Sequence, residues 1–178
     1  MDEFDLSIDE LDDIVREKLK PSRYEHTKNV QELALEMASK YGVDVEKASI
    51  AALFHDYCKD SKLENNNLLH GGMASDIFEN EFGMKDDDIL NSIRYHTTGR
   101  AGMSPLELVV FLADTLEPGR TYSNVDELRE LAFDNLYKGA LEVLYELKIY
   151  LEKNGYNMSR DSDEAIAWLE NLEGKYDK

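Results

Sequence analysis

The histidines of this chain are few and unusually placed. The sequence of 178 residues holds four of them: His26, His55, His70 and His96. Three of the four fall on the apolar face of a predicted helix, and His70 lies at the start of another. One inward-facing histidine is most often a hydrogen-bonded core residue. Four of four favour a shared metal site, because neutral imidazole is a common ligand of Fe, Mn and Zn.

Two aspartates extend this pattern. Asp56 directly follows His55 in the stretch FHDYCKD, and Asp114 shares a helix face with Leu106 and Val110. A carboxylate on an apolar face is costly to bury unless it is paired or bound to a metal. Six ligands exceed what one catalytic metal needs while it keeps a position open, so two metals fit better. Asp56 is the natural bridge, since His55 can hold one ion while Asp56 contacts both.

Helix-start signals recur along the chain and predict an all-α fold. Asp44 and Asp86 can cap two helices, and Gly42 can end another. Pro21 interrupts the first predicted helix. Three capping boxes are predicted, formed by Ser7 with Glu10, Ser22 with Glu25, and Ser104 with Glu107.

The sequence shows no strand-like alternation, no internal repeat and no long linker. Its 178 residues suit one domain with a sizeable core, so we expect a single domain over residues 1–178. Residues of about 20–125 contain all six candidate ligands and should form the core that holds the metal site. Helices within 124–175, one of them carrying Trp168, should pack on that core.

The composition restricts the partners of this protein. A formal net charge of −18 repels phosphate backbones and anionic lipids, so neither a nucleic acid polymer nor a membrane is expected. The longest apolar runs, such as LVVFLA at 108–113, are too short to span a bilayer. One cysteine, Cys58, excludes an internal disulfide and is expected to pack in the core. The N-terminal stretch lacks the apolar region of a signal peptide, so we expect a cytoplasmic protein.

The order H…HD…H…H…D resembles the frame of the HD-domain metallohydrolases. Five stretches resemble one bacterial branch, the YqeK-type HD proteins, which are symmetrical diadenosine tetraphosphate hydrolases. These stretches are RYEHTKNV (23–30), IAALFHDYCKD (50–60), LHGGMA (69–74), IRYHTTGRAGMSPLE (93–107) and VVFLADTLEPGR (109–120). HTTGRAGMS and ADTLEPGR discriminate this branch best. LHGG departs from relatives that often carry a proline two residues after the histidine, although His70 itself is kept.

The resemblance implies an all-α HD-domain helical bundle with two divalent metal ions, commonly iron, although Mn or Zn would also suit the ligands. It implies hydrolysis of diadenosine tetraphosphate to two ADP, with a hydroxide between the metals as the attacking group. Carried over by position, one metal would be held by His26, His55, Asp56 and Asp114. The second would be held by Asp56, His70 and His96.

Cations near these motifs are candidates for binding phosphate. Each could instead be a solvated surface residue, but they cluster beside ligands in a chain with 38 acidic and 20 basic residues. A charge-assisted hydrogen bond to phosphate contributes roughly 1.5–3 kcal/mol. The candidate substrate-binding cations are Arg23, Lys59, Arg100 and Arg120. Among the acidic and basic residues, Asp56, Lys59 and Arg100 are predicted to act in catalysis.

The loop that follows His96 is a further candidate for contact with phosphate. Thr97, Thr98 and Gly99 could offer hydroxyl and backbone N–H groups to phosphate oxygens. An ordinary loop at the end of a helix explains these residues equally well.

Three other functions share parts of this pattern. Another HD phosphohydrolase, acting on nucleoside mono- or diphosphates, would have the same metal site. A di-iron oxygenase would use the metals for redox chemistry, but the surrounding cations favour a phosphate substrate. A nucleotide sensor would bind without turnover, although all six ligands are present. The expected partner is a small nucleotide, a dinucleoside polyphosphate with a nucleoside diphosphate as product, and the chain could form a homodimer.

Overall fold

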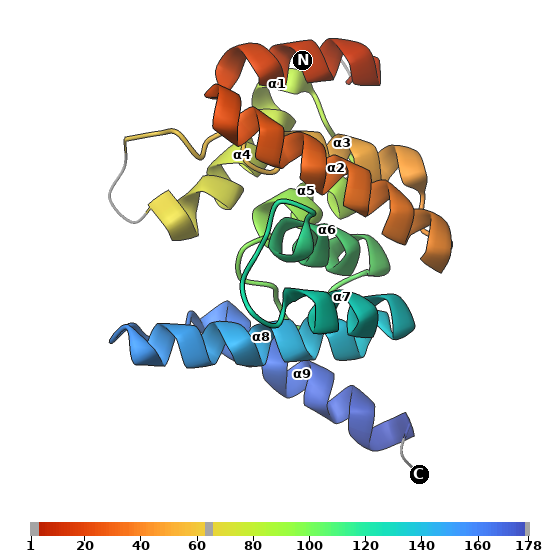
Figure 1. The fold of residues 1–178 in the computed structure, drawn as a ribbon. Coiled ribbons are helices and arrows are strands. Elements are labelled where there is room, and N and C mark those ends of the chain that lie inside the picture. The colour runs from red at the N-terminus through yellow and green to blue at the C-terminus, as the bar shows by residue number, and fades with distance from the viewer. Residues whose placement is uncertain (1–3, 63–65, 177–178) are drawn as a thin grey trace.

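The computed structural model describes residues 4–62 and 66–176, and every regular element in these ranges is an α-helix (Figure 1). The helices are α1 (Ile8–Lys18), α2 (Pro21–Tyr41), α3 (Val45–Phe54), α4 (Asn66–Phe82), α5 (Asp87–Arg94), α6 (Pro105–Leu116), α7 (Val125–Asp134), α8 (Leu136–Lys153) and α9 (Arg160–Tyr176). The all-α fold predicted from the sequence is confirmed.

Most of the helix ends that the sequence predicts lie where they are expected. Gly42 ends α2 in the left-handed conformation, with a φ of 67°, which glycine adopts at little cost. Side-chain caps are present at the starts of α1, α3, α5 and α6, formed by Ser7, Asp44, Asp86 and Ser104. Local sequence therefore sets one end of each of four helices that carry or precede the candidate ligands: the end of α2 and the starts of α3, α5 and α6.

The predicted capping box of Ser22 and Glu25 is wrong. Helix α2 begins at Pro21 with Lys20 as its N-cap, so Ser22 lies inside the first turn. Proline suits the first helical position because it lacks an N–H that would be unpaired there, and because its φ already matches the helix. Pro21 therefore starts α2 as well as separating it from α1.

Helix α6 lies at the centre of the molecule. Nine of its twelve residues are buried, and it packs against α2, α3, α5, α7 and α8. The apolar run LVVFLA explains this position, because a helix that is apolar on all sides is stable only when it is surrounded. Since Asp114 follows this run on the same helix, its carboxylate is carried into the interior.

The C-terminal helices α7, α8 and α9 form the lower part of the molecule in Figure 1. Helix α8 packs on α6 and α7, and α9 packs on α8. Near the start of α9, the Ser162 hydroxyl donates to the Thr98 carbonyl at 2.7 Å, which ties this helix to the loop after α5. The single domain over residues 1–178, with a core at about 20–125 and helices within 124–175 packed on it, stays a prediction.

None of the helices in the described ranges is long and apolar enough to cross a membrane.

Candidate metal centre

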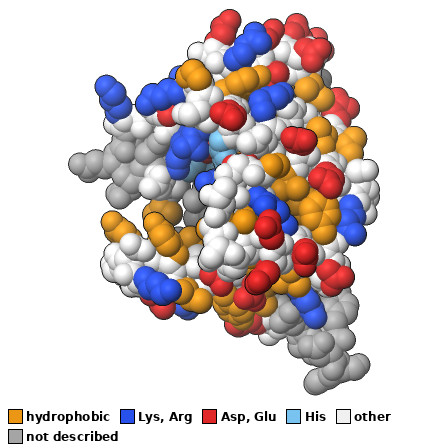
Figure 2. All heavy atoms as spheres, viewed as in Figure 1, with side chains coloured by type: hydrophobic (Ala, Val, Ile, Leu, Met, Phe, Trp, Pro, Cys, Tyr) orange, Lys and Arg blue, Asp and Glu red, His pale blue; other side chains and the backbone are white. Residues whose placement is uncertain are grey.

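The six candidate ligands come together from five parts of the chain. His26 lies in α2, His70 in α4 and Asp114 in α6, while the pair His55–Asp56 follows α3 and His96 follows α5. The side chains of His26 and Asp114 are 10% and 19% exposed, and the other four are buried. Figure 2 shows histidine atoms reaching the surface beside lysine and arginine side chains. The cluster is therefore buried but open to solvent at one side.

A first group consists of His26, His55, Asp56 and Asp114. His26 Nε2 lies 2.9 Å from Asp114 Oδ1 and 3.6 Å from Asp56 Oδ2. His55 Nε2 lies 3.5 Å from each of these two oxygens. Each of the four residues offers one ligand atom, and these atoms all lie within 4.8 Å of one another. Two imidazoles and two carboxylates at this spacing suit Fe, Mn or Zn.

A second group consists of Asp56, His70 and His96. The Oδ1 atom of Asp56 lies 3.1 Å from His70 Nε2 and 3.4 Å from His96 Nε2. The two imidazole Nε2 atoms are 2.9 Å apart. Asp56 thus turns Oδ2 toward the first group and Oδ1 toward the second. This is the geometry that a carboxylate shared by two metal ions requires.

Two of the histidines are oriented by the ends of the helices they follow. His55 Nδ1 lies 2.6 Å from the Ala52 carbonyl, and His96 Nδ1 lies 2.6 Å from the Ile93 carbonyl. These carbonyls are near helix C-termini, where the last turn leaves carbonyl groups without a helical partner. A carbonyl can only accept, so each Nδ1 carries hydrogen and donates it. In the neutral ring, Nε2 then has a lone pair directed at the cluster.

The charges in the cluster favour a bound cation. Burial by itself would lower the pKa of His55, but the Asp56 and Asp114 carboxylates raise it to about 10. Burial likewise opposes ionisation of Asp56, yet contacts with His55, His70 and His96 hold the pKa of Asp56 well below its usual range. The two carboxylates therefore stay ionised and keep a proton nearby. A divalent metal would displace that proton when it binds.

One buried nitrogen in the cluster also favours a bound metal. His55 Nε2 is fully buried and makes no hydrogen bond in the described part of the chain. A buried polar atom without a hydrogen bond is costly, and few such atoms occur in folded proteins. This nitrogen lies between two carboxylates, where a metal ion would satisfy it.

Two of the predicted cations contact the candidate ligands. Arg23 Nη1 lies 3.0 Å from Asp56 Oδ2. Arg120 donates from Nη2 to the Asp114 backbone carbonyl at 3.1 Å, and the same nitrogen is 3.8 Å from Asp114 Oδ1. Each guanidinium thus lies beside one of the two carboxylates, at the edge of the cluster.

Lys59 belongs to the same group of charges. Burial lowers the pKa of Lys59, Arg23 and Arg120 lower it further, and Asp56 and Asp114 raise it. Its Nζ donates to Asn67 Oδ1 at 2.9 Å, at the start of α4. Lys59 is therefore close enough to both arginines and both carboxylates for their charges to change its pKa.

Arg100 occupies a different environment. Its Nε and Nη2 donate at 2.7 Å to the two carboxylate oxygens of buried Glu107, and its guanidinium carbon lies 5.3 Å from the Tyr95 ring centre. Among the described interactions of Arg100, none joins it to the six candidate ligands. A role for Arg100 in catalysis or substrate binding stays a prediction.

The loop after His96 is held by its own contacts. The Thr98 hydroxyl donates to the Gly99 carbonyl at 2.9 Å, and Gly99 has a φ of 66°. Contacts of Thr97, Thr98 and Gly99 with phosphate stay predictions.

Two residues near the site were not predicted from the sequence. Glu117 is buried, and its Oε1 lies 3.2 Å from His26 Nδ1. Gly71 brings α4 close to the end of α5, because a Cβ there would lie 2.8 Å from the Arg94 carbonyl oxygen and 3.2 Å from His96 Nδ1. Their position inside the motifs ADTLEPGR and LHGGMA was the available signal, but it did not say what they contact.

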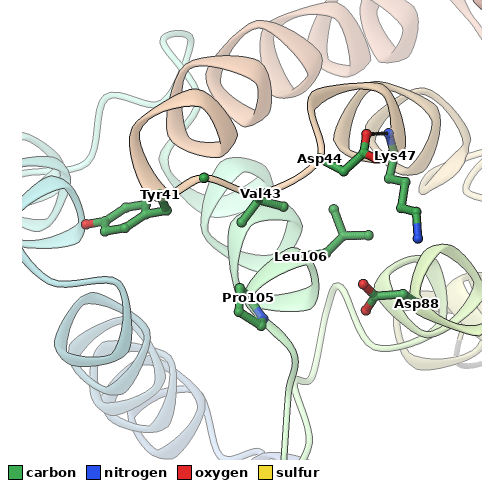
Figure 3. Close-up of a pocket in the computed structure, with 8 residues that line it drawn as sticks. Tyr41, Val43, Asp44, Lys47, Asp88, Pro105 and Leu106 are labelled. Atoms are coloured by element: carbon green, nitrogen blue, oxygen red, sulfur yellow. Dashed lines mark hydrogen bonds between the residues drawn. The ribbon is translucent and has the colours of Figure 1, made fainter.

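A pocket of about 270 Å³ lies elsewhere, between the end of α2 and the starts of α3 and α6 (Figure 3). Its lining shares no residue with the two ligand groups. Its polar side chains already have structural partners: Asp44 caps α3, Lys47 pairs with Asp86, and Asp88 accepts from Ser104. We therefore assign the chemistry to the histidine–aspartate cluster.

Comparison with known proteins agrees with this geometry. The HD domain family matches residues 23–119. The symmetrical bis(5'-nucleosyl)-tetraphosphatase of Bacillus subtilis (strain 168) is 35% identical over 87% of this chain and 93% of that protein. The chain belongs to the HD-domain family, in the branch of these tetraphosphatases. This result confirms the resemblance seen in the motifs. The protein of the same name from Staphylococcus aureus is 34% identical over 80% of this chain and 81% of its own length.

A solved structure has the same fold as this HD-family chain. It is the crystal structure of a predicted HD superfamily hydrolase involved in NAD metabolism from Clostridium acetobutylicum. The two structures superpose with a TM-score of 0.86 at 33% sequence identity, covering 94% of this chain and 98% of that one. The C-terminal helices beyond the HD match are therefore part of a shared architecture.

The shared position of Asp56 can be tested by metal content. Asp56→Ala is expected to lose the metal of both groups, because it removes one oxygen from each. His96→Ala is expected to lose mainly the metal of the second group. Elemental analysis of loaded, gel-filtered protein measures both, with exposed Asp60→Ala as the control. Two ions retained in Asp56→Ala would contradict the bridging role.

The adjacent glycines of α4 offer a matched test of how the second group is built. Gly71→Ala should push α4 away from the end of α5 and lower the free energy of unfolding by about 1–3 kcal/mol. It should also weaken metal binding by His70 and His96. Gly72→Ala should be neutral or stabilise by up to about 1 kcal/mol, because its Cβ would meet Arg94 Nη1 at an ordinary 3.5 Å. Urea unfolding and metal titration measure both effects. Equal behaviour of the two variants would show that the close approach at Gly71 is unimportant.

Proposed function

We propose that this protein hydrolyses diadenosine tetraphosphate symmetrically to two ADP, with two divalent metal ions as cofactors. The observation that carries the proposal is the buried Asp56, whose two oxygens face separate ligand groups. The relatives named symmetrical bis(5'-nucleosyl)-tetraphosphatase, similar over most of their length, support this substrate class. We propose iron as the metal, with manganese or zinc as alternatives that the same ligands accept.

The proposed ligands are those predicted from the sequence. The first metal would be held by His26, His55, Asp56 and Asp114, and the second by Asp56, His70 and His96. Divalent ions at such a site lower the pKa of bound water to near neutrality and offset charge on phosphate oxygens. The chain itself supplies the fixed lone pairs of its histidines and the negative field of Asp56 and Asp114.

Three cations are proposed to hold the tetraphosphate. Arg23 and Arg120 lie beside the Asp56 and Asp114 carboxylates, and Lys59 shares their field. With metals bound, the carboxylates would be neutralised, and these cations could turn toward phosphate oxygens. Lys59 and Asp56 are proposed to act in catalysis by orienting the phosphate chain and the metals. Arg100, which Glu107 already binds, would reach phosphate only after leaving that carboxylate.

The chemistry of symmetrical cleavage follows from the substrate. Water adds to one of the two inner phosphorus atoms, and the bond from that atom to the central bridging oxygen breaks. The leaving oxygen takes a proton from the water, so two ADP molecules result. In-line attack and charge neutralisation are the main requirements of such a phosphoryl transfer, and no serine or cysteine nucleophile is needed. Cys58, which is buried, is therefore proposed to be a packing residue.

A second candidate is another HD phosphohydrolase that acts on nucleoside mono- or diphosphates. It would use the same ligands and differ in how the nucleotide is held. The tetraphosphatase is favoured because the relatives of that name cover nearly the whole chain. A di-iron oxygenase and a sensor without turnover are disfavoured, since cations line the cluster and its ligand set is complete. We further propose a cytoplasmic location and assembly as a homodimer.

The decisive experiment is product analysis with metal-loaded protein. Diadenosine tetraphosphate should give ADP as the sole nucleotide product, and activity should be lost on chelation and restored by metal. AMP with ATP would contradict symmetrical cleavage. Faster turnover of simple nucleoside mono- or diphosphates would favour the second candidate, and oxygen consumption with an organic co-substrate would favour the oxygenase.

The cations can be ranked by kinetics. Lys59→Ala and Arg120→Ala should each lower kcat/KM on the order of 10- to 100-fold, corresponding to roughly 1.5–3 kcal/mol for a charged hydrogen bond. Arg100→Ala should have a smaller effect on kcat/KM and a larger effect on the free energy of unfolding, because it leaves buried Glu107 without its charged partner. Comparing steady-state kinetics with urea unfolding separates the two. An Arg100 defect equal to that of Lys59, with unchanged stability, would instead place Arg100 on the substrate.

A further inference from the structure

We propose that Glu117 is a positioning residue that fixes the tautomer and the ring orientation of His26. The inference rests on the proposed role of His26 as a metal ligand. Glu117 lies at the C-terminal end of α6, three residues after Asp114, and its side chain is 5% exposed. It contacts His26 on the side of the ring that faces away from the ligand cluster. The residue therefore acts on the metal site without being one of its six ligands.

Both oxygens of Glu117 accept from N–H groups. Oε1 lies 3.2 Å from His26 Nδ1, and Oε2 accepts from the Gly119 backbone N–H at 2.5 Å. A carboxylate has no hydrogen to donate, so His26 Nδ1 must carry the hydrogen between them. The other ring nitrogen, Nε2, also faces carboxylates, at 2.9 Å from Asp114 and 3.6 Å from Asp56. A first metal bound there would replace hydrogen on Nε2, and Glu117 would keep the remaining hydrogen on Nδ1.

The two N–H donors explain why an acid is needed at this position. Glutamine has almost the same shape, but its amide has one accepting oxygen and one donating nitrogen. It could accept from His26 or from Gly119, and the remaining donor would face an NH2 group. Only a carboxylate satisfies both donors at once. The requirement is therefore for charge and hydrogen-bond pattern rather than for volume.

The turn after α6 is built to hold this carboxylate. A Cβ on Gly119 would lie 2.9 and 3.1 Å from the two Glu117 carboxylate oxygens, so a larger residue there would push this carboxylate aside. From α7, Arg129 donates to the backbone carbonyls of Leu116, Glu117 and Arg120. These carbonyls belong to the end of α6 and the turn after it, where helical partners are missing. The turn is thus fixed from outside, and Glu117 is fixed within it.

His26 differs in this respect from two other histidines of the cluster. His55 and His96 donate to backbone carbonyls of their own chain segments, which no side-chain substitution removes. His26 lies in the second turn of α2, where the carbonyls are used by the helix itself, so its partner must come from another element. Glu117 supplies it from α6. A carboxylate behind a metal-binding imidazole also makes the ring a stronger ligand.

Glu117→Gln is the test, with Glu10→Gln in the exposed capping box of α1 as the matched control. Zn²⁺ affinity is measured without nucleotide, by competition with a chromophoric chelator. Loss of a partner behind a metal-bound histidine typically weakens binding about 10- to 100-fold. We expect that loss for Glu117→Gln and none for Glu10→Gln. Unchanged affinity in Glu117→Gln would overturn the proposal.

A spectroscopic measurement tests the same idea in the unmutated protein. With four histidines, ¹⁵N–¹H correlation spectra of the Zn²⁺-loaded chain can resolve each imidazole. We expect His26 to carry hydrogen on Nδ1 and to bind through Nε2, and Glu117→Gln to shift the His26 signals most. His26 bound through Nδ1, or protonated on Nε2, would overturn the proposal even if Glu117→Gln fails to fold.

Metal binding by the unmutated chain distinguishes failure of the positioning role from failure of the proposed function. If the unmutated chain binds no divalent metal, the metal-dependent function fails first. If it binds metal and Glu117→Gln binds equally well, the positioning role alone fails. A purely structural role would lower the unfolding free energy of the metal-free protein and leave its Zn²⁺ affinity and His26 tautomer unchanged, which also contradicts the proposal.

Discussion

The site depends on one buried carboxylate, that of Asp56. Its burial would be costly without partners, and four histidines and an arginine surround its two oxygens. Because one oxygen faces each ligand group, the distance between the groups is limited by the width of a single carboxylate. The helices that carry the other ligands must therefore converge on this point. The central position of α6 and the glycine contact between α4 and α5 both serve that convergence.

Helix ends orient two of the histidines that surround Asp56. His55 and His96 each follow a short helix and donate to a carbonyl three residues back, which lies near the helix C-terminus. The same bond supplies a partner for the carbonyl and presents Nε2 to the cluster. His26 lies within a long helix and cannot use this device, so it takes a carboxylate from α6 instead. The backbone thus positions two ligands and a side chain positions a third.

The sequence predicted the candidate ligands more completely than the residues that surround them. Four histidines, the aspartate next to His55 and the inward-facing Asp114 were enough to select all six residues that the structure groups. The start of α2 was misplaced, because a proline at the first helical position outweighed the Ser22 capping signal. Arg100 was grouped with the phosphate-binding cations, and its ion pair with Glu107, seven residues later in the chain, was not predicted. Glu117 was missed because an acid near a helix end is most often a solvated residue.

By itself the sequence determined the all-α class, several helix limits and the identity of the candidate ligands. These features depend on local hydrogen bonds and on the period of apolar residues, both of which are readable along the chain. Tertiary structure decided how close the members of each ligand group lie, which oxygen of Asp56 faces each group, and which cations lie at the cluster. Those properties depend on distances between helices far apart in sequence. Side-chain packing sets such distances to a few tenths of an ångström, and residue type and spacing do not encode them directly.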